Sequence, residues 1–122
     1  MLAVGVDMIE NERVARSLER FGARFADRIF TAAEQLQCNG RIPSLAGRFA
    51  VKEAVAKALG TGIGDMNWTD IEIINNERGK PELHLHNQAL VMAQDQGLAN
   101  WSISLSHTNT HAIGFAVGMH SG

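Results

Sequence analysis

The stretch RFAVKEAVAKALGTGIG, residues 48–64, consists mostly of alanine, valine and phenylalanine and ends in a run of glycines. At about 100° per residue, its apolar side chains cover nearly the whole circumference of a helix. A helix that is apolar nearly all round is normally buried. The sequence therefore predicts a buried central helix, capped at its start by Ser44 and stopped by the glycines.

Glu53 and Lys57 lie one turn apart on a narrow polar strip of this helix. A Glu-to-Lys pair at this spacing stabilises an exposed helix by about 0.2–0.5 kcal/mol, and a surface ion pair is the simplest interpretation. That interpretation suits a helix with a broad polar face, which this one lacks. Charges on a buried helix need partners or a ligand, so we favour a ligand for Glu53 and Lys57. Lys52 lies alone on the apolar side, and the sequence assigns it no role.

Asp7 is the natural companion of Glu53. Residues 2–9 (LAVGVDMI) alternate large apolar residues with small ones, so they predict a strand whose small face ends in the Asp7 carboxylate. Two carboxylates that converge from different elements suggest Mg²⁺, which prefers oxygen ligands and retains water and phosphate. Lys57 would then contact an anionic phosphate. The loop GTGIG (60–64) lets a backbone approach a bulky anion, although a simple helix stop explains the same glycines.

The remaining residues predict a single α+β domain over residues 1–122, with a largely antiparallel sheet packed on helices. Thr31 and Glu34 have the spacing of a capping box at the start of a short helix. The other expected elements are a helix over 10–24, strands over 71–74 and 82–86, a helix over 87–97, and strands over 101–107 and 112–119.

The composition is that of a soluble protein. Hydrophobic residues make up 45% and charged residues 20% of the 122 residues, an ordinary globular balance. No apolar run approaches the roughly 18 residues that a membrane helix needs, and the N-terminus lacks the pattern of a signal peptide. Cys38 is the single cysteine, which excludes an intrachain disulfide. We therefore expect a cytoplasmic protein without membrane association.

Arginines dominate the residues between 13 and 48, where seven of them stand against three acidic residues. A solvated helix face is the simplest interpretation. A docking surface for an acidic partner is the sharper one, because clustered positive charge attracts such a partner over a long range. Nucleic acid is a poor candidate, since the net charge is -2 and aromatic residues make up only 6% of the chain.

His107 continues the alternation of the strand expected over 101–107, so it should emerge from the buried face at the strand's end. A hydrogen-bonded structural histidine and a catalytic histidine both fit that position. His84 and His86 share a strand face without an obvious third ligand, and the pair His107/His111 straddles a turn. We therefore do not expect a zinc site.

Three segments together resemble the holo-acyl-carrier-protein synthases, which are small, single-domain 4′-phosphopantetheinyl transferases. The segments are, in order, VGVDMIENERV (4–14), AGRFAVKEAVAKALGTGIG (46–64) and SISLSHT (102–108). RFADRIFTAAE (24–34) and GKPEL (79–83) also fit, so the resemblance spans nearly the whole chain. Its most specific part is the KEA-x-x-KA core together with the upstream G-x-D.

The resemblance implies transfer of phosphopantetheine from coenzyme A to a serine hydroxyl of apo-acyl carrier protein, with release of adenosine 3′,5′-bisphosphate. By this resemblance Asp7 and Glu53 bind Mg²⁺. Lys57 and His107 contact the phosphates, and with Glu53 they form the implied catalytic group. The implied setting is fatty acid biosynthesis.

The resemblance also implies further contacts. Coenzyme A binding is implied for Arg48, Lys57, Gly60, Thr61, Gly62, Lys80, Pro81 and His107. Docking of acyl carrier protein is implied for Arg13, Arg20 and Arg24. Members of the family are homotrimers with active sites at subunit interfaces, so the same assembly is expected here.

The sequence leaves open the identity of the base and two alternative functions. The serine hydroxyl needs a base, and Glu53, a metal-bound water and His107 are all candidates. A different metal-dependent phosphoryl-group enzyme, such as a small pyrophosphatase, would use the same Asp7–Glu53 pair. The second alternative function is a non-catalytic module that docks carrier protein through the arginine helix.

Overall fold

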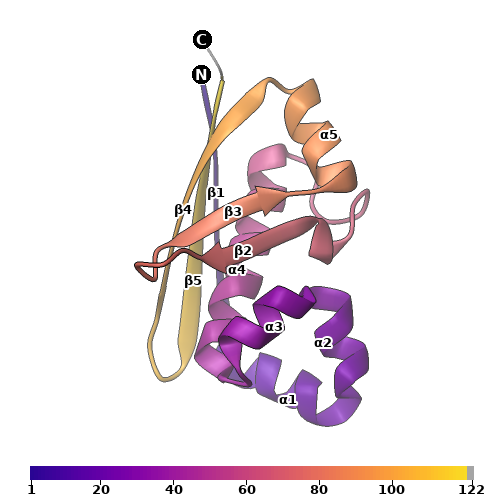
Figure 1. Cartoon of the computed structure of the whole chain (residues 1–122), viewed down its shortest axis with the longest axis vertical. Helices are drawn as coiled ribbons and strands as arrows, with labels where there is room; N and C mark the ends of the chain where they lie inside the picture. The colour runs from indigo at the N-terminus through magenta and orange to yellow at the C-terminus, as the bar shows by residue number, and fades with distance from the viewer. Residues whose placement is uncertain (121–122) are drawn as a thin grey trace.

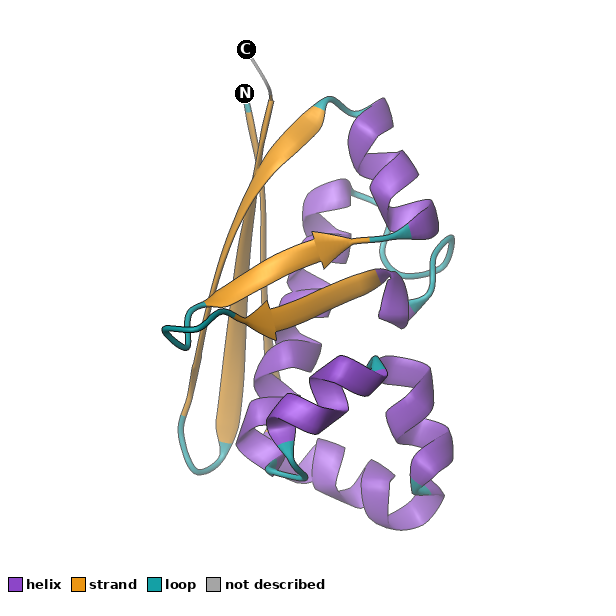
Figure 2. Ribbon diagram, viewed as in Figure 1, coloured by secondary structure: helices purple, strands orange, loops and turns teal. Residues whose placement is uncertain are grey.

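Helix α4 (Ile42–Leu59) runs through the middle of the molecule in this computed structural model, which describes residues 1–120 (Figures 1 and 2). A three-stranded sheet lies on one side of α4, and a two-stranded hairpin lies on another. The sheet has the order β1–β5–β4, and β2 pairs with β3. The strands are β1 (Leu2–Glu10), β2 (Ile71–Asn75), β3 (Pro81–Leu85), β4 (Leu98–His107) and β5 (His111–His120). All pairings are antiparallel, which confirms the predicted α+β class.

The other helices lie at the two ends of α4 (Figure 1). They are α1 (Asn11–Phe21), α2 (Ala23–Ile29) and α3 (Ala32–Cys38) near one end and α5 (Asn87–Asp95) near the other, with a 3₁₀ helix at Trp68–Asp70 before β2. No helix within residues 1–120 combines the length and hydropathy needed to cross a bilayer. Residues 121 and 122, the end of the predicted domain, lie outside the described residues.

Two predicted helix boundaries are wrong, and one cap is confirmed. The helix expected over 10–24 is divided at Gly22, whose φ of 56° ends α1 and begins α2. Ser44 is not the cap of α4, because the helix begins earlier, at Ile42, after Arg41. The capping box is present: the Thr31 hydroxyl accepts from the N–H of Glu34, whose carboxylate accepts from the N–H of Thr31.

The three-stranded sheet turns its small residues, not its large ones, toward α4. Gly5 of β1 and Gly114 of β5 are buried under the helix, whereas Val4 and Val6 are 57% and 49% exposed. A Cβ atom on Gly5 would lie 1.8 Å from the carbonyl oxygen of Ala54. The helix backbone therefore rests directly on the strands, which only glycine permits at these two positions.

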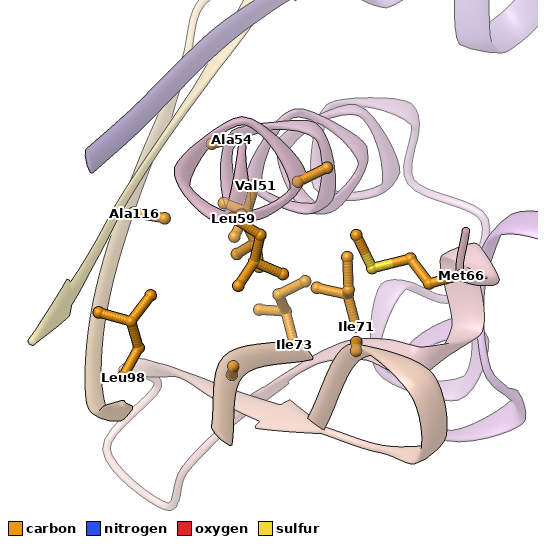
Figure 3. Close-up of a cluster of buried hydrophobic side chains, with 12 residues drawn as sticks. Val51, Ala54, Leu59, Met66, Ile71, Ile73, Leu98 and Ala116 are labelled. Atoms are coloured by element: carbon orange, nitrogen blue, oxygen red, sulfur yellow. The ribbon is translucent and has the colours of Figure 1, made fainter. Parts of the chain in front are cut away.

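Larger side chains fill the space between α4 and the hairpin. Figure 3 shows Val51 and Leu59 of α4 facing Ile71 and Ile73 of β2, and all four are buried. At the other end of α4, a second cluster around Phe49 joins the helix to α1, α2 and α3. Both clusters depend on α4, which explains why this helix is apolar on almost every side.

The free edge of β2 is covered by polar side chains rather than by another strand. Lys52 of α4 donates to the carbonyl oxygen of Ile71 and, at 2.7 Å, to Oε1 of Glu34 on α3. Oε2 of Glu34 accepts from the N–H of Ile73 at 2.9 Å. Lys52 and Glu34 are both fully buried, so their charges compensate each other inside the protein. Lys52 thus has the partners that the sequence could not name.

Arg48 and Gln37 repeat this arrangement one turn away. Nε of Arg48 donates to the carbonyl oxygen of Ile73 at 3.0 Å, and Nη2 donates to Oε1 of Gln37 at 2.8 Å. The same Gln37 oxygen accepts from the N–H of Asn75 at 2.9 Å. The four side chains Glu34, Gln37, Arg48 and Lys52, named here the polar seam, therefore bind α3 and α4 to the edge of β2.

Candidate active site

Asp7, Glu53 and Lys57 come together where β1 passes the second half of α4. Nζ of Lys57 donates to Oδ1 of Asp7 at 2.7 Å and to the carbonyl oxygen of Val6 at 3.1 Å. The carboxyl group of Glu53 lies within hydrogen-bonding reach of Asp7. The narrow polar strip predicted from the sequence thus faces the carboxylate at the end of the small strand face.

The close contact between α4 and β1 produces this convergence. Asp7 has the same strand parity as Gly5, so its side chain points toward the helix that rests on Gly5. Helix α4 ends directly beyond Lys57, where Gly60 takes the left-handed conformation at φ 82° and donates its N–H to the carbonyl oxygen of Lys57. Asp7 is largely shielded, with 14% of its side chain exposed, whereas 56% of the Lys57 side chain is exposed.

The electrostatics of the three groups are strongly linked. Burial, together with the hydrogen bond and the negative charge of Asp7, raises the pKa of Glu53 to about 7, although Arg13 and Lys57 oppose this. Burial also acts to raise the pKa of Asp7, but hydrogen bonds with Glu53 and Lys57 outweigh it and hold that pKa below its ordinary value. The hydrogen bond to Asp7 raises the pKa of Lys57. Asp7 is therefore the group that ionises first, and Glu53 keeps its proton to a much higher pH than an ordinary glutamate.

A cavity of about 280 Å³ opens beside these groups. Its lining residues are Glu53, Ala56, Lys57, Gly62, Ile63 and Trp68. Glu53 and Lys57 supply its charged groups, and Trp68 supplies an apolar wall. Gly62, with φ at 65°, turns the loop back over the end of α4. A ligand with an anionic group and an adjoining apolar part fits such a site.

The residues that line this cavity differ in part from those predicted from the sequence. Some lining residues were not predicted, and some predicted residues do not line it. Trp68 and Ile63 were missed because an isolated apolar residue after a glycine loop resembles ordinary core. Of the predicted loop residues, Gly62 lines the cavity. Gly60 terminates the helix, and the exposed Thr61 hydroxyl donates to the carbonyl oxygen of Gly62. Contacts of Gly60 and Thr61 with coenzyme A stay predictions.

His107 does not join the group around Asp7 within one chain. It lies exposed at the end of β4, opposite Ala112 of β5, whereas Asp7 lies on β1 opposite Gly114. Strand β5 therefore separates the two side chains, and neighbouring strands are about 4.8 Å apart. The phosphate contact and catalytic role implied for His107 therefore stay predictions, and at this site they would require the histidine of a second chain.

Lys80 and Pro81 lie on a different side of α4 from Glu53. Lys80 ends the β2–β3 turn and Pro81 begins β3, and both line a separate cavity of about 350 Å³ between β3 and residues 101–103 of β4. Arg48, expected to hold coenzyme A phosphates, is instead 4% exposed and serves the polar seam through Nε and Nη2. Any contact of Arg48 with a phosphate would therefore fall to the N–H groups of the guanidinium that Ile73 and Gln37 do not use, and that role stays a prediction.

The arginines of α1 and α2 border two hollows that share Phe21, and Glu19 is the one acidic side chain among the described residues that line them. Arg13, Arg16 and Arg20 border a hollow of about 640 Å³ together with Phe21, and Phe21 also borders the next hollow with Arg24. Arg13 lies near enough for its charge to act on Glu53. The predicted docking residues Arg13, Arg20 and Arg24 thus lie on one surface that adjoins the Asp7–Glu53 pair.

Comparison with known proteins gives one consistent result. Residues 3–116 match the family model of the 4′-phosphopantetheinyl transferase superfamily. The holo-acyl-carrier-protein synthase of Herpetosiphon aurantiacus is 46% identical over 98% of this chain and 99% of its own length. That of Alkaliphilus metalliredigens is 45% identical over 93% of this chain and 95% of its own length.

Solved structures of holo-acyl-carrier-protein synthases are similar to this chain in fold. The Helicobacter pylori holo-acyl-carrier-protein synthase in complex with coenzyme A superposes with a TM-score of 0.87 at 30% identity, covering 95% of this chain and 99% of that one. The Neisseria meningitidis enzyme superposes with a TM-score of 0.84 at 37% identity, covering 96% and 97%. The fold, the convergence of Asp7 with Glu53 and Lys57, and these likenesses lead to one conclusion: the chain belongs to the holo-acyl-carrier-protein synthase family of the 4′-phosphopantetheinyl transferase superfamily.

Proposed function

We propose that the protein transfers 4′-phosphopantetheine from coenzyme A to a serine hydroxyl of apo-acyl carrier protein and releases adenosine 3′,5′-bisphosphate. The observation that carries this proposal is the convergence of Asp7, Glu53 and Lys57 beside an open cavity. The similar Helicobacter pylori structure contains coenzyme A, which supports coenzyme A as the donor. The same proposal places the reaction in the cytoplasm and in the supply of active carrier protein for fatty acid biosynthesis.

Asp7 and Glu53 have the donor set for a Mg²⁺ ion. They offer two carboxylates from two packed elements and leave the remaining positions to water and phosphate oxygens, which Mg²⁺ favours. No group of three or more His, Cys, Asp or Glu side chains in residues 1–120 is placed to hold a metal by itself. A bound Mg²⁺ would neutralise the pyrophosphate and stabilise the departing adenosine 3′,5′-bisphosphate.

The side chains around that position have distinct tasks in the proposed reaction. The exposed ammonium group of Lys57 exchanges Asp7 for a phosphate oxygen and stabilises the charge that gathers there. The serine oxygen forms a bond to the β-phosphorus as the bond to the bridging oxygen of the leaving group breaks. The hydroxyl proton passes to a base. Glu53 lies closer to Asp7 and Lys57 than His107 of the same chain does, so we propose its carboxylate as the base.

We further propose a homotrimer in which a neighbouring chain completes each site. The outer face of the three-stranded sheet carries exposed apolar side chains, among them Val4, Val6, Met8, Phe115 and Met119. A contiguous apolar surface of this kind marks an interface. The separation of His107 from Asp7 within one chain supports the same assembly, since a neighbour can supply the missing histidine.

A mass measurement tests the proposed activity. The protein is incubated with coenzyme A, Mg²⁺ and apo-acyl carrier protein, and the carrier is weighed. The expected result is a gain of one phosphopantetheine group on the carrier. An unchanged carrier mass contradicts the proposal. Release of adenosine 3′,5′-bisphosphate without carrier would instead favour a hydrolase, and binding without either product would favour a docking module.

The affinity for Mg²⁺ should increase with pH up to about pH 7. A proton on Glu53 must leave before the carboxylate can bind a cation, and the pKa of Glu53 is about 7. Below that value we expect about a tenfold loss of affinity for each pH unit, and above it a plateau. Calorimetric titration with MgCl₂ at pH 6, 7 and 8 measures this. An affinity that stays constant over this range contradicts a metal site at Glu53.

Arg20→Glu should weaken binding of apo-acyl carrier protein about tenfold and leave coenzyme A affinity unchanged. Arg20 borders the same hollow of α1 as Arg13, whereas Arg13 is the arginine whose charge acts on the Glu53 carboxyl group. Reversal of a surface charge mainly slows association with an oppositely charged partner. Surface plasmon resonance compares this variant with Arg78→Glu, a matched reversal on the exposed β2–β3 turn. Equal losses in both variants would exclude a specific docking surface on α1.

Val6→Glu should convert the assembly to monomers. Val6 is 49% exposed at the outer face of β1, opposite Phe115 of β5, so the substitution places a charge within the proposed interface. Sedimentation velocity measures the mass. The matched control is Val91→Glu, because Val91 is 44% exposed on α5 away from that face. A wild-type monomer, or a trimer that persists in Val6→Glu, contradicts the proposed interface.

A further inference from the structure

We propose that Lys52 is a positioning residue for the active site: its ammonium group holds the 3₁₀ helix Trp68–Asp70 against α4 and thereby fixes the indole wall beside Glu53 and Lys57. The inference rests on the proposed function, because it concerns how the same cavity is shaped for coenzyme A.

All three N–H groups of the Lys52 ammonium have partners in three different segments. They donate to Glu34 of α3, to the carbonyl oxygen of Ile71 at the start of β2, and to the carbonyl oxygen of Trp68 at 3.1 Å. A lysine ammonium group has three N–H donors, so all of those of Lys52 are used within the protein and none remains for a substrate. Two of the three bonds hold the short stretch that runs from the cavity wall into β2.

Trp68 is thereby held to α4 from two sides. Its carbonyl oxygen accepts from Lys52, and its ring packs edge-on against Phe49, with centroids 5.0 Å apart and planes at 73°. Phe49 and Lys52 are three residues apart on the helix that also carries Glu53. The indole wall and the catalytic carboxyl group are therefore fixed to the same segment of helix, which keeps their separation constant.

Stability alone is a weak reason for a buried ion pair at this position. A buried pair can often be replaced by apolar side chains of similar size without loss of stability, because desolvation of the charges offsets their attraction. The pair of Lys52 and Glu34 is completely buried. What an apolar pair could not do is donate hydrogen bonds to the carbonyl oxygens of Trp68 and Ile71. The geometry thus points to placement of the 3₁₀ helix as the task of Lys52.

The test is a double variant, Glu34→Leu with Lys52→Met, which keeps apolar volume and removes both charges. It is made in a Trp101→Phe background, so that Trp68 is the only remaining tryptophan of the two. We expect a folded protein in which the KM for coenzyme A rises at least tenfold and the quenching of Trp68 fluorescence by coenzyme A is lost. Ile73→Ala in the same background is the matched control, because Ile73 is fully buried under the same hairpin. That control should be less stable but keep its KM within twofold.

A double variant with wild-type KM and wild-type quenching overturns the inference, and so does an Ile73→Ala control that raises KM equally. If the double variant does not fold, Lys52→Gln, which removes the ammonium group and leaves Glu34 in place, is judged by the same two measurements, the KM for coenzyme A and the quenching of Trp68 fluorescence. Fluorescence quenching needs coenzyme A alone. A protein that binds coenzyme A but does not modify carrier protein therefore contradicts the proposed function, while quenching in the variants still decides the role of Lys52.

Discussion

Glu53→Gln should lower kcat/KM for phosphopantetheine transfer at least about 10³-fold, and it should at the same time stabilise the metal-free protein at pH 8. The loss of activity follows because an amide is a poor Mg²⁺ ligand and cannot accept the serine proton. Removal of a single preorganised electrostatic group typically lowers a rate by about 10²–10³, and this substitution removes two functions. Mass spectrometry of the carrier protein, with time-resolved sampling, measures the rate.

The gain in stability follows from the direction of the Glu53 pKa shift. The folded protein raises the pKa of Glu53 from 4.5 to about 7, so folding opposes ionisation of this group. Its contribution to stability is therefore present at low pH and is lost as the pH rises from about 4.5 through 7. At pH 8 the wild-type protein contains the unfavourable carboxylate beside Asp7, whereas glutamine is neutral. Thermal unfolding without Mg²⁺ should therefore show a higher Tm for Glu53→Gln at pH 8 and no such gain at pH 4.

Glu77→Gln is the matched control for both measurements, because Glu77 is exposed in the β2–β3 turn. It should change neither the rate nor the pH dependence of unfolding. Added Mg²⁺ should raise the Tm of the wild-type protein and of Glu77→Gln but not that of Glu53→Gln. An active Glu53→Gln variant would remove Glu53 from the catalytic group, and a variant less stable at pH 8 would contradict the repulsion between Glu53 and Asp7.

The sequence could predict the site wherever a local pattern carries the information. The narrow polar strip of α4 identified Glu53 and Lys57, and strand parity placed Asp7 on the face that meets them. Both patterns depend on backbone geometry within one element, which a single sequence contains. The same reasoning identified the capping box at Thr31.

Patterns within one element could not show which elements meet. Lys52 and Arg48 differ little from other charged residues in the sequence, but their partners come from α3 and from the edge of β2. The wall formed by Trp68 depends on the loop after α4 folding back over the helix, and no periodicity describes such a loop. The large apolar face of β1 would ordinarily be expected inside, yet it lies outside because the small face is the one that fits against α4.

Gly5→Ala should destabilise the protein by about 3 kcal/mol or more, at the upper end of the effects of overpacking. The added Cβ would lie 1.8 Å from the carbonyl oxygen of Ala54 and 2.8 Å from its carbonyl carbon, and both atoms belong to the helix backbone. A rotating side chain cannot relieve this contact, so α4 or β1 must move. Urea unfolding measures the change. Gly64→Ala is the matched control, because a Cβ there meets nothing within 4 Å and its φ is ordinary.

The same substitution should impair the active site in the molecules that remain folded. Asp7 follows Gly5 by two residues, so a shift of β1 away from α4 lengthens the 2.7 Å contact between Asp7 and Lys57 and separates Asp7 from Glu53. Magnesium affinity should then fall together with stability, and the pKa of Glu53 should return toward 4.5 because its nearest negative charge has moved away. Gly114→Ala, which meets the backbone of Val51 at 2.4 Å from the neighbouring strand, should have the same two effects. A Gly5→Ala protein with wild-type stability, or a destabilised one that retains wild-type Mg²⁺ affinity, would break the link between close packing and assembly of the site.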